Sequence, residues 1–410
     1  MNTDVFFTEW NQRAPGQRRD LGRCAALLRE LGIAADERPV LGVVGSKGKG
    51  TAATYASAYL SAAGLDVVTV TSPGLRGNRD RLRINGAAVD EGTLAKLADE
   101  LAAAIARLPA PEDGYLSPSG LFLAAGALLA RARGADVLVL EAGMGGRGDE
   151  LSLFAPRVVA LTTVFAEHIG VLGDTVEEIA WEKASVAGPA TEIFVHLPLR
   201  GELGAIARRA VRERTSGRVD PERVRPQSTG LPASLFPRGL PRLSAELGCL
   251  AAARLLTALH RGAPAPLRLR AVLETVTLPA RLSHHRVEGT ETEVVIDSAI
   301  DRAGISAAVA HARQQWSDID HVLLCLPDHK DVDGAVLELG AFPVTTVVLP
   351  DEHLKFERPL PPAWRRITMA ELTAEGIASL GTRVLVLGTV YFTGRVLELV
   401  GADTERLFTV

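Results

Sequence analysis

The stretch Gly45-Ser46-Lys47-Gly48-Lys49-Gly50-Thr51 decides the fold of this chain because of what stands on either side of it. The apolar run Val40–Val44 precedes it, and the small-residue run Ala52–Ala63 follows it. A buried strand that turns through glycines into a helix is typical of a phosphate-binding loop, in which backbone N–H groups and the helix N-terminus face phosphate oxygens. The pattern therefore predicts a nucleoside triphosphate site rather than a Gly/Lys-rich surface turn.

Two side chains of this loop carry the expected chemistry. Lys49 is placed to reach the β- and γ-phosphates, and Thr51 is placed to bind Mg²⁺. Gly50 is a departure from the common loop, in which serine or threonine follows the lysine directly.

The composition is that of an ordinary soluble globular protein. The chain has 410 residues, which exceeds the size at which single cores stop growing, so two domains are expected. The net charge of −4 comes without a basic stripe, so no nucleic-acid partner is expected. Cys24, Cys249 and Cys325 are too widely spaced to indicate a disulfide framework or a zinc cluster.

No targeting or membrane-spanning segment is recognisable in the sequence. The N-terminal residues lack the basic and apolar regions of a secretory signal, and no window contains 18 uninterrupted apolar residues. These features predict a cytoplasmic protein without a membrane partner.

Short β-branched runs alternate with longer helical patterns, which predicts an α/β fold with a mostly parallel sheet. The expected strands of the first domain are 40–44, 66–71, 136–140, 158–164 and 193–196, and the main expected helices are 94–108, 119–133 and 245–260. A second alternation has expected strands at 293–297, 321–326, 344–349 and 383–387. We therefore predict a P-loop ATP-binding domain over residues 1–280 and a smaller Rossmann-like α/β domain over residues 281–410.

Further candidate site residues follow the expected strands of the first domain. Glu141 ends an apolar run and precedes the glycine-rich stretch 142–147, so it is a candidate Mg²⁺ ligand. His168 follows the next strand, and carboxyl ends of parallel strands are where α/β sheets place their chemistry. On its own, a histidine such as His168 is more often structural than a ligand. Lys183 alone would be interpreted as a surface lysine, and Ser72 alone as a turn residue.

Together these residues strongly resemble the folylpolyglutamate synthase and dihydrofolate synthase branch of the Mur ligase family. That branch carries a glycine between its loop lysine and hydroxyl residue, as Gly50 does here. The resemblance covers nearly the whole chain and rests on a series of short motifs: the phosphate loop, Ser72-Pro73, Arg79–Gly86, Leu140–Arg147, Glu167-His168, Leu172-Gly173, Glu182–Ala184, Asp328–Asp331 and Leu387–Thr389.

The resemblance implies an enzyme of a specific kind. It would be an ATP- and Mg²⁺-dependent, ADP-forming ligase that joins a carboxylic acid to an amine or amino acid through an acyl phosphate. Lys49, His168 and Lys183 would be its catalytic residues, and relatives often carry the lysine that matches Lys183 as a carbamate formed with CO₂. Phosphoryl transfer between anions requires positive charge at its midpoint, which two metal ions and a lysine supply.

The resemblance also implies the metal and nucleotide ligands. Thr51 and Glu141 would hold one Mg²⁺, and Ser72, His168 and Lys183 would place a second. The nucleotide-binding residues that it implies are Gly45, Ser46, Lys47, Gly48, Lys49, Gly50, Thr51, Arg281 and Asp297.

Several pocket positions depart from the family pattern. Relatives have Ala-His-Asn-Pro after the aspartate that matches Asp297, whereas this chain has Ser298–Asp301. The family's Ser-Pro-His-Leu is Ser72–Leu75 here, with Gly74 in place of histidine. The remaining departures are the loss of a Phe-Glu pair near 115–120, the loss of an asparagine within 245–256, and Glu167 in place of aspartate.

These departures favour a ligase with an intact phosphate and metal centre that acts on a non-folate substrate, in a specialised or secondary-metabolite pathway. The alternatives are a true folylpolyglutamate or dihydrofolate synthase, and a degenerate nucleotide-binding homologue with weak ligase activity. A kinase or GTPase has less support, because the Asn-Lys-x-Asp guanine signature is absent and the second domain would have no task. The resemblance favours a monomer, and the sequence names neither the acid nor the amine.

Overall fold

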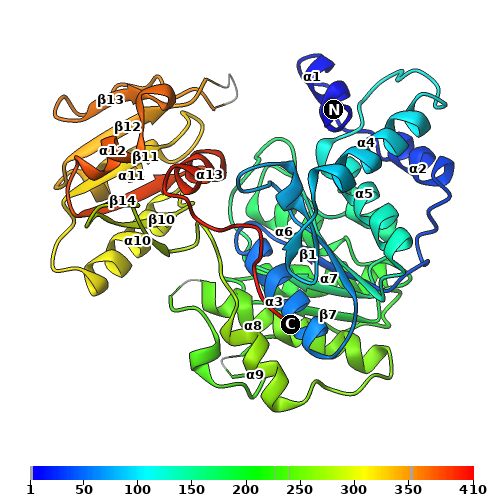
Figure 1. Cartoon of the computed structure of the whole chain (residues 1–410). Helices are drawn as coiled ribbons and strands as arrows, with labels where there is room; N and C mark the ends of the chain where they lie inside the picture. Colours follow the sequence, from blue (N-terminus) through cyan, green and yellow to red (C-terminus); the bar gives the residue numbers. More distant parts are fainter. Residues whose placement is uncertain (1–2, 226, 240, 351–353) are drawn as a thin grey trace. The chain divides into compact units, whose positions relative to one another are not determined.

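The computed structural model describes residues 3–225, 227–239, 241–350 and 354–410. The chain forms two compact units (Figure 1). The first unit consists of Met1–Pro73, Arg79–Val276 and Glu405–Val410, and the second consists of Gly74–Asn78 and Thr277–Thr404. The main division lies close to the predicted boundary between residues 280 and 281, but the units exchange two short segments.

An eight-stranded sheet forms the centre of the first unit, with the strand order β4-β3-β2-β5-β1-β6-β7-β8. The strands from β2 to β8 in this order pair in parallel, and β3 and β4 form an antiparallel edge. The strands are β1 (Val40–Val44), β2 (Val67–Val70), β3 (Leu82–Ile84), β4 (Ala87–Ala88), β5 (Val137–Glu141), β6 (Val158–Leu161), β7 (Ile193–His196) and β8 (Glu222–Arg223).

Helices connect the strands of the first unit and cover its sheet (Figure 1). They are α1 (Thr8–Gln12), α2 (Leu21–Glu30), α3 (Lys49–Ala62), α4 (Glu91–Ile105), α5 (Pro118–Arg133), α6 (Val176–Ala184), α7 (Leu203–Arg214), α8 (Pro241–Ala258) and α9 (Pro266–Glu274). All residues of α3 from 51 to 62 are buried, and most of them are alanine, serine or threonine, whose small side chains let neighbouring elements enclose the helix.

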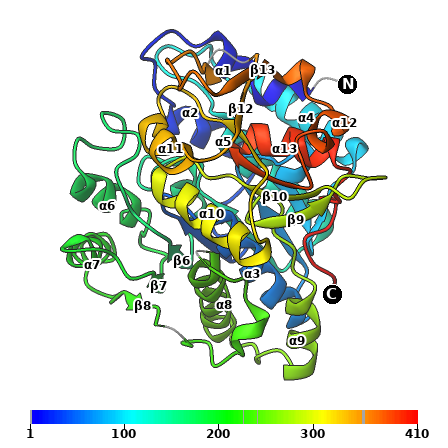
Figure 2. The same cartoon turned by 90° about the vertical axis from the view of Figure 1, so that its left-hand side faces the viewer.

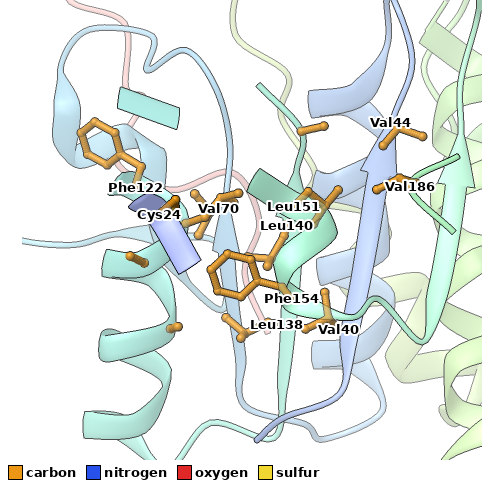
Figure 3. Packing of buried hydrophobic residues seen from close by; sticks show 14 of the residues in the cluster. Cys24, Val40, Val44, Val70, Phe122, Leu138, Leu140, Leu151, Phe154 and Val186 are labelled. Atoms are coloured by element: carbon orange, nitrogen blue, oxygen red, sulfur yellow. The ribbon is translucent and has the colours of Figure 1, made fainter. Parts of the chain in front are cut away.

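Side chains of neighbouring strands meet in a core beneath the carboxyl edge of this sheet. Val40 of β1 and Leu138 and Leu140 of β5 pack with Leu151 and Phe154 of the short 3-10 helix η3 (Glu150–Phe154), as Figure 3 shows. These strands are apolar on both faces, as expected for a parallel sheet covered on both sides. The packing holds β1 and β5 against η3, and β5 ends in the candidate site residue Glu141.

The last residues of the chain return to the edge of the first sheet. Ala88 N donates to Glu405 O (2.8 Å), and Leu407 N donates to Gly86 O (3.0 Å). The Phe408 side chain is buried, so this segment is packed against the first unit rather than trailing from the second. The sequence-based domain limits placed these residues in the second domain.

The second unit is a six-stranded sheet with the order β13-β12-β11-β14-β10-β9, parallel except for β9. Figure 2 shows β9 beside β10. Val294 and Ile296 of β10 pack in one core cluster with residues of α12 and α13, and Val295 packs in another with residues of α10 and α11. Helices therefore cover both faces. The elements are β9 (Ser283–Arg286), β10 (Glu293–Asp297), α10 (Arg302–Gln315), β11 (His321–Cys325), α11 (Val332–Leu339), β12 (Val344–Val348), β13 (Arg365–Thr368), α12 (Ala374–Ala378), β14 (Arg383–Gly388) and α13 (Val390–Leu399).

The predicted fold class is confirmed, since both units are α/β with mostly parallel sheets. Every predicted strand is present within a few residues of its expected limits. Among the described residues, five short strands were not predicted from the sequence, and these are β3, β4, β8, β9 and β13. All of them lie at or next to sheet edges, where the hydrophobic pattern of a buried strand is absent.

Candidate active site

Four adjacent strands of the first unit end in candidate site residues. The sheet order places β2, β5, β1 and β6 side by side, and they are parallel. Ser72 follows β2, Glu141 ends β5, the phosphate loop follows β1, and His168 lies in the loop after β6. The fold therefore brings these four parts of the sequence to one edge of the sheet.

The phosphate loop forms a tight turn between β1 and α3. Gly45 has a φ of 136°, and a Cβ atom there would lie 2.0 Å from the Thr162 Oγ1 atom, so no other residue fits this position. Ser46 N donates to Thr163 O (2.7 Å), which holds the loop against the segment after β6. The Lys49 ammonium donates to Gly45 O (3.0 Å) and therefore lies over the loop, as expected for a phosphate-binding lysine.

Glu141 lies beside the first turn of α3. Its Oε2 atom is 3.6 Å from the position that a Cβ atom of Gly50 would occupy, next to Thr51 in the chain. The same oxygen accepts a hydrogen bond from Ser72 N (3.1 Å). A carboxylate and two hydroxyl groups are hard oxygen donors, the ligand type that Mg²⁺ prefers, so these residues fit the implied metal.

No three His, Cys, Asp or Glu side chains of the described residues cluster in the manner of a protein-only metal site. Mg²⁺ is usually bound through one or two carboxylates together with substrate phosphates and water. A single carboxylate at the phosphate loop is therefore the arrangement expected for a metal that arrives with a nucleotide.

Lys183 and Glu167 form a buried ion pair that the sequence analysis did not predict. Lys183 Nζ lies 2.8 Å from Glu167 Oε1, and the Lys183 side chain is only 1% exposed. The same ammonium donates to Gly45 O (3.2 Å), the carbonyl that also accepts from Lys49. The expectation for Lys183 read in isolation, a surface lysine, is therefore wrong, and its catalytic and metal-binding roles stay predictions.

The protonation of this pair follows from its burial. Burial lowers the pKa of the Lys183 ammonium, and Glu167 opposes that shift only in part. Burial alone would raise the pKa of the Glu167 carboxyl, but the charges of Lys183 and Lys49 and a hydrogen bond from Ser46 lower it below its ordinary value. The pocket therefore favours an ionised carboxylate and increases the neutral fraction of the amine.

Acidification is expected to weaken the fold through Glu167. Because the folded-state pKa lies below the ordinary value of 4.5, the stabilising contribution is present above pH 4.5 and is lost as the pH falls through the folded-state pKa. Urea unfolding of wild type and Glu167→Gln should differ by about 1–3 kcal/mol at pH 7 and converge in acid. Glu112→Gln, on an exposed loop, is the control. A pH-independent difference for Glu167→Gln would contradict the pairing.

His168 lies in a loop with an unusual backbone conformation. Its φ of 49° is in the left-handed region that non-glycine residues rarely adopt, and such outliers often occur at functional sites. Val171 N donates to the His168 carbonyl (3.0 Å), which stabilises the turn. Phe165 and Ile169 are exposed large apolar residues in the same loop. The role of His168 at a second metal ion stays a prediction.

Arg281 and Asp297, the other two predicted nucleotide contacts, lie close together in the second unit. Asp297 Oδ2 accepts from Leu282 N (2.9 Å), and Arg281 Nη1 donates to Ala280 O (2.8 Å). Ala280 and Leu282 both have positive φ values, 56° and 54°. The backbone on either side of Arg281 is therefore strained and held in place by Asp297, whereas nucleotide contact by either residue stays a prediction.

A second buried polar cluster near the site also escaped the sequence analysis. Arg19 forms ion pairs with Asp149 (3.0 Å) and Glu150 (2.9 Å) beside the glycine-rich loop that follows Glu141. Two adjacent acidic residues directly after a glycine-rich stretch were the signal in the sequence.

None of the described helices has both the length and the apolar character needed to cross a membrane.

Comparison with known proteins finds relatives in sequence. No family model matches the chain. It is 35% identical over 195 residues to a probable bifunctional folylpolyglutamate synthase/dihydropteroate synthase of Halobacterium salinarum, covering 47% of this chain and 24% of the relative. It is 29% identical over 172 residues to a dihydrofolate synthase/folylpolyglutamate synthase of Bacillus subtilis, covering 42% and 40%. The matched parts thus span less than half of these relatives.

Solved structures extend the similarity to nearly the whole chain at the level of fold. A folylpolyglutamate synthase in complex with AMPPCP and folate has a TM-score of 0.76 at 21% identity, over 97% of this chain and 99% of that one. The Mycobacterium tuberculosis folylpolyglutamate synthase complexed with ADP has a TM-score of 0.77 at 22% identity, over 97% and 99%. The resemblance to the folylpolyglutamate synthase branch that the motifs predicted is confirmed.

Proposed function

We propose, because the chain is a sequence and fold relative of the folylpolyglutamate synthases, that it is an ATP- and Mg²⁺-dependent ligase that joins a folate-type carboxylic acid to glutamate. In the proposed reaction a carboxylate oxygen attacks the γ-phosphorus of ATP, which releases ADP and forms an acyl phosphate. The amine nitrogen then attacks the acyl carbon, the C–O bond to phosphate breaks, and the amine loses a proton. The products are an amide, ADP and inorganic phosphate.

The observation that carries this proposal is the convergence of two lysines on one carbonyl of the phosphate loop. Lys49 and Lys183 both donate to Gly45 O, at 3.0 and 3.2 Å. The Lys49 ammonium would offset the negative charge of the terminal phosphate and the incoming carboxylate, which repel each other, and Lys183 would add positive charge at the same point, either as an ammonium or as a carbamate that holds a second Mg²⁺. A simple nucleotide-binding protein has no need for the second, buried lysine.

Other residues of the site would order the reactants. The N–H groups of the phosphate loop would hold the β- and γ-phosphates, and Thr51 and Glu141 would hold a Mg²⁺ that arrives with ATP. Bound Mg²⁺ would supply positive charge to the phosphate oxygens. Ser72 donates to Glu141 through its backbone N–H, and its hydroxyl oxygen accepts from Arg81 Nη1 (3.2 Å), a partner that it would exchange to bind the same metal.

Lys183 fits a carbamate on two counts. Its lowered pKa increases the fraction of Lys183 in the neutral amine form. The neutral nitrogen attacks CO₂ and then loses a proton to give the carbamate. The pocket around it contains a second cation, Lys49, close enough to affect its charge state. A carbamate there would accept from Lys49 or bind a second Mg²⁺, the role that the family resemblance implies.

A non-folate acid and a different amine form a second candidate pair, which the second unit favours. Where relatives carry histidine, Ala299 is completely buried and offers no polar contact. Where relatives carry proline, Asp301 caps α10 by accepting from Gly304 N (2.7 Å). The substrate groups that those family residues bind would therefore need other partners here.

A matrix of acids and amines tested for phosphate release discriminates between these functions. Folates with glutamate are the reference pair, and other carboxylic acids and amino acids form the rest. We expect release above background only when ATP, Mg²⁺, an acid and an amine are all present, and largest with the folate–glutamate pair. Release that needs an acid but no amine would indicate a kinase, and no release with any pair would contradict ligase activity. A cytoplasmic monomer without nucleic-acid or membrane partners remains the prediction from the sequence.

A further inference from the structure

The glycine-rich loop of residues 142–148 connects two parts of the candidate site. It begins directly after Glu141 and ends at Asp149, before η3. A Cβ atom on Gly146 would lie 2.3 Å from Glu182 O, so the loop backbone is pressed against the end of α6, next to Lys183. The loop therefore joins the strand end that carries Glu141 to the end of α6 that carries Lys183.

Arg19 holds this loop from the side of the N-terminal segment. Its Nη1 atom lies 3.0 Å from Asp149 Oδ2 and 2.9 Å from Glu150 Oε2, and its Nη2 atom donates to Met144 O. Asp149 Oδ2 also accepts from Met144 N (2.8 Å). Both backbone polar groups of Met144 are thus bound by one Arg–Asp pair, which fixes the peptide groups on both sides of its Cα atom.

The ion pairs of Arg19 with Asp149 and Glu150 are buried. The side chain of Asp149 is fully buried, and those of Glu150 and Arg19 are 1% and 11% exposed. Burial and the neighbouring Asp149 raise the pKa of Glu150, and Arg19 opposes this rise. Without Arg19, two adjacent carboxylates would stay buried with no cation hydrogen-bonded to them, and Asp149 would lose the partner that orients it towards Met144.

Arg19 is itself anchored rather than mobile. Asp20 N donates to Tyr115 O (3.0 Å), and Tyr115 N donates to Arg18 O (3.2 Å), so the backbone around Arg19 is paired on both sides. On the opposite side of the loop, Glu182 Oε1 accepts from Gly148 N (2.6 Å). The loop is therefore held between an anchored arginine and the residue that precedes Lys183.

We propose that Arg19 is a positioning residue that fixes the loop after Glu141 and thereby sets the affinity of the site for Mg²⁺ in the presence of a nucleotide. This inference rests on the proposed function. Arg19 touches neither Glu141 nor the phosphate loop through any contact described for it, so its effect is transmitted through the Met144 peptide.

Mg²⁺ titrations at fixed AMPPCP, followed by calorimetry, test this role without relying on turnover. Arg19→Met should raise the Mg²⁺ concentration for half-maximal nucleotide binding about tenfold or more, because charged hydrogen bonds to the loop are lost. Nucleotide binding in EDTA should not change. Arg19→Lys, which keeps the charge but lacks the planar fork, should fall between wild type and Arg19→Met. Backbone hydrogen exchange of residues 142–148 in metal-free protein should be faster in Arg19→Met.

Arg23→Met is a matched control. Arg23 lies in the same N-terminal segment, is 9% exposed and pairs with Glu9 (2.7 Å), away from the loop. If Arg19 has only a structural role, Arg19→Met and Arg23→Met should both melt at a lower temperature than wild type, and both should keep the wild-type Mg²⁺ requirement. That result would overturn the inference. If Arg19→Met does not fold, a wild-type Mg²⁺ requirement in Arg19→Lys would do the same. Absence of Mg²⁺-dependent nucleotide binding in wild type would instead refute the proposed function.

Discussion

Lys49→Ala is expected to lower the rate of acid- and amine-dependent phosphate release by about 10²- to 10³-fold. Lys49 begins α3 and lies over the loop carbonyl of Gly45, so its ammonium faces the space where loop N–H groups would hold phosphate. The charge that it supplies grows in importance as the γ-phosphoryl group leaves ADP, so the loss should appear in kcat more than in KM for ATP.

The control for this variant is Lys96→Ala, since Lys96 is exposed on α4. Both proteins should melt within a few degrees of wild type, because the Lys49 ammonium contacts only loop carbonyls among the hydrogen bonds described for it. Turnover by Lys49→Ala near the wild-type rate would remove the phosphate role from Lys49 and leave the loop as a structural turn.

The phosphate loop could be predicted from the sequence because its structure is local. The run Val40–Val44, the glycines and the small residues of α3 are consecutive, and each favours the strand, turn or helix that it forms. The parallel sheet followed from the alternation of strands and helices, and the meeting of Glu141, His168 and the loop at one edge followed from parallel topology.

Contacts that depend on tertiary structure could not be predicted in the same way. Lys183 and Glu167 are separated by a loop and a helix, and the helical pattern around Lys183 is the pattern of an exposed position. Arg19 and Asp149 are 130 residues apart, so no sequence period connects them. The strands β9 and β13 contain charged and polar residues and exist because a neighbouring strand offers hydrogen-bond partners.

The expectation of a non-folate substrate rested on departures from the family pattern, and the structure gives these departures less importance. Two of the five departures, at Gly74 and at Ser298–Asp301, lie in the second unit. Three lie in the first unit, and one of these, Glu167, pairs with Lys183 in the ordered contacts beside Gly45. Substitutions that keep the Lys183 ion pair are expected to alter the choice of substrate more than the phosphoryl transfer step. The folate–glutamate pair is therefore the reference against which other substrates should be ranked.

Lys183→Ala is expected to reduce ligase turnover by about 10²- to 10³-fold, and small carboxylates such as formate, acetate or propionate should restore part of it. Alanine leaves space beside Glu167, Gly45 O and Lys49, and an added carboxylate there replaces the anionic end of a carbamate rather than the ammonium. Lys183→Arg keeps a cation but cannot be carbamylated, so it should stay inactive and should not respond to these acids.

The ammonium and carbamate forms of Lys183 predict opposite results in these variants, so the experiment distinguishes between them. If the residue acts as an ammonium, Lys183→Arg should keep more activity than Lys183→Ala, and added carboxylates should inhibit both. If it acts as a carbamate, wild type prepared in ¹³C-bicarbonate should show a carbamate carbon by NMR that is absent from both variants. Because the buried amine has a lowered pKa, this signal should grow as the pH rises through that pKa, where the neutral amine accumulates. Wild-type turnover by Lys183→Ala would exclude both roles and leave the pair with Glu167 as a purely structural contact.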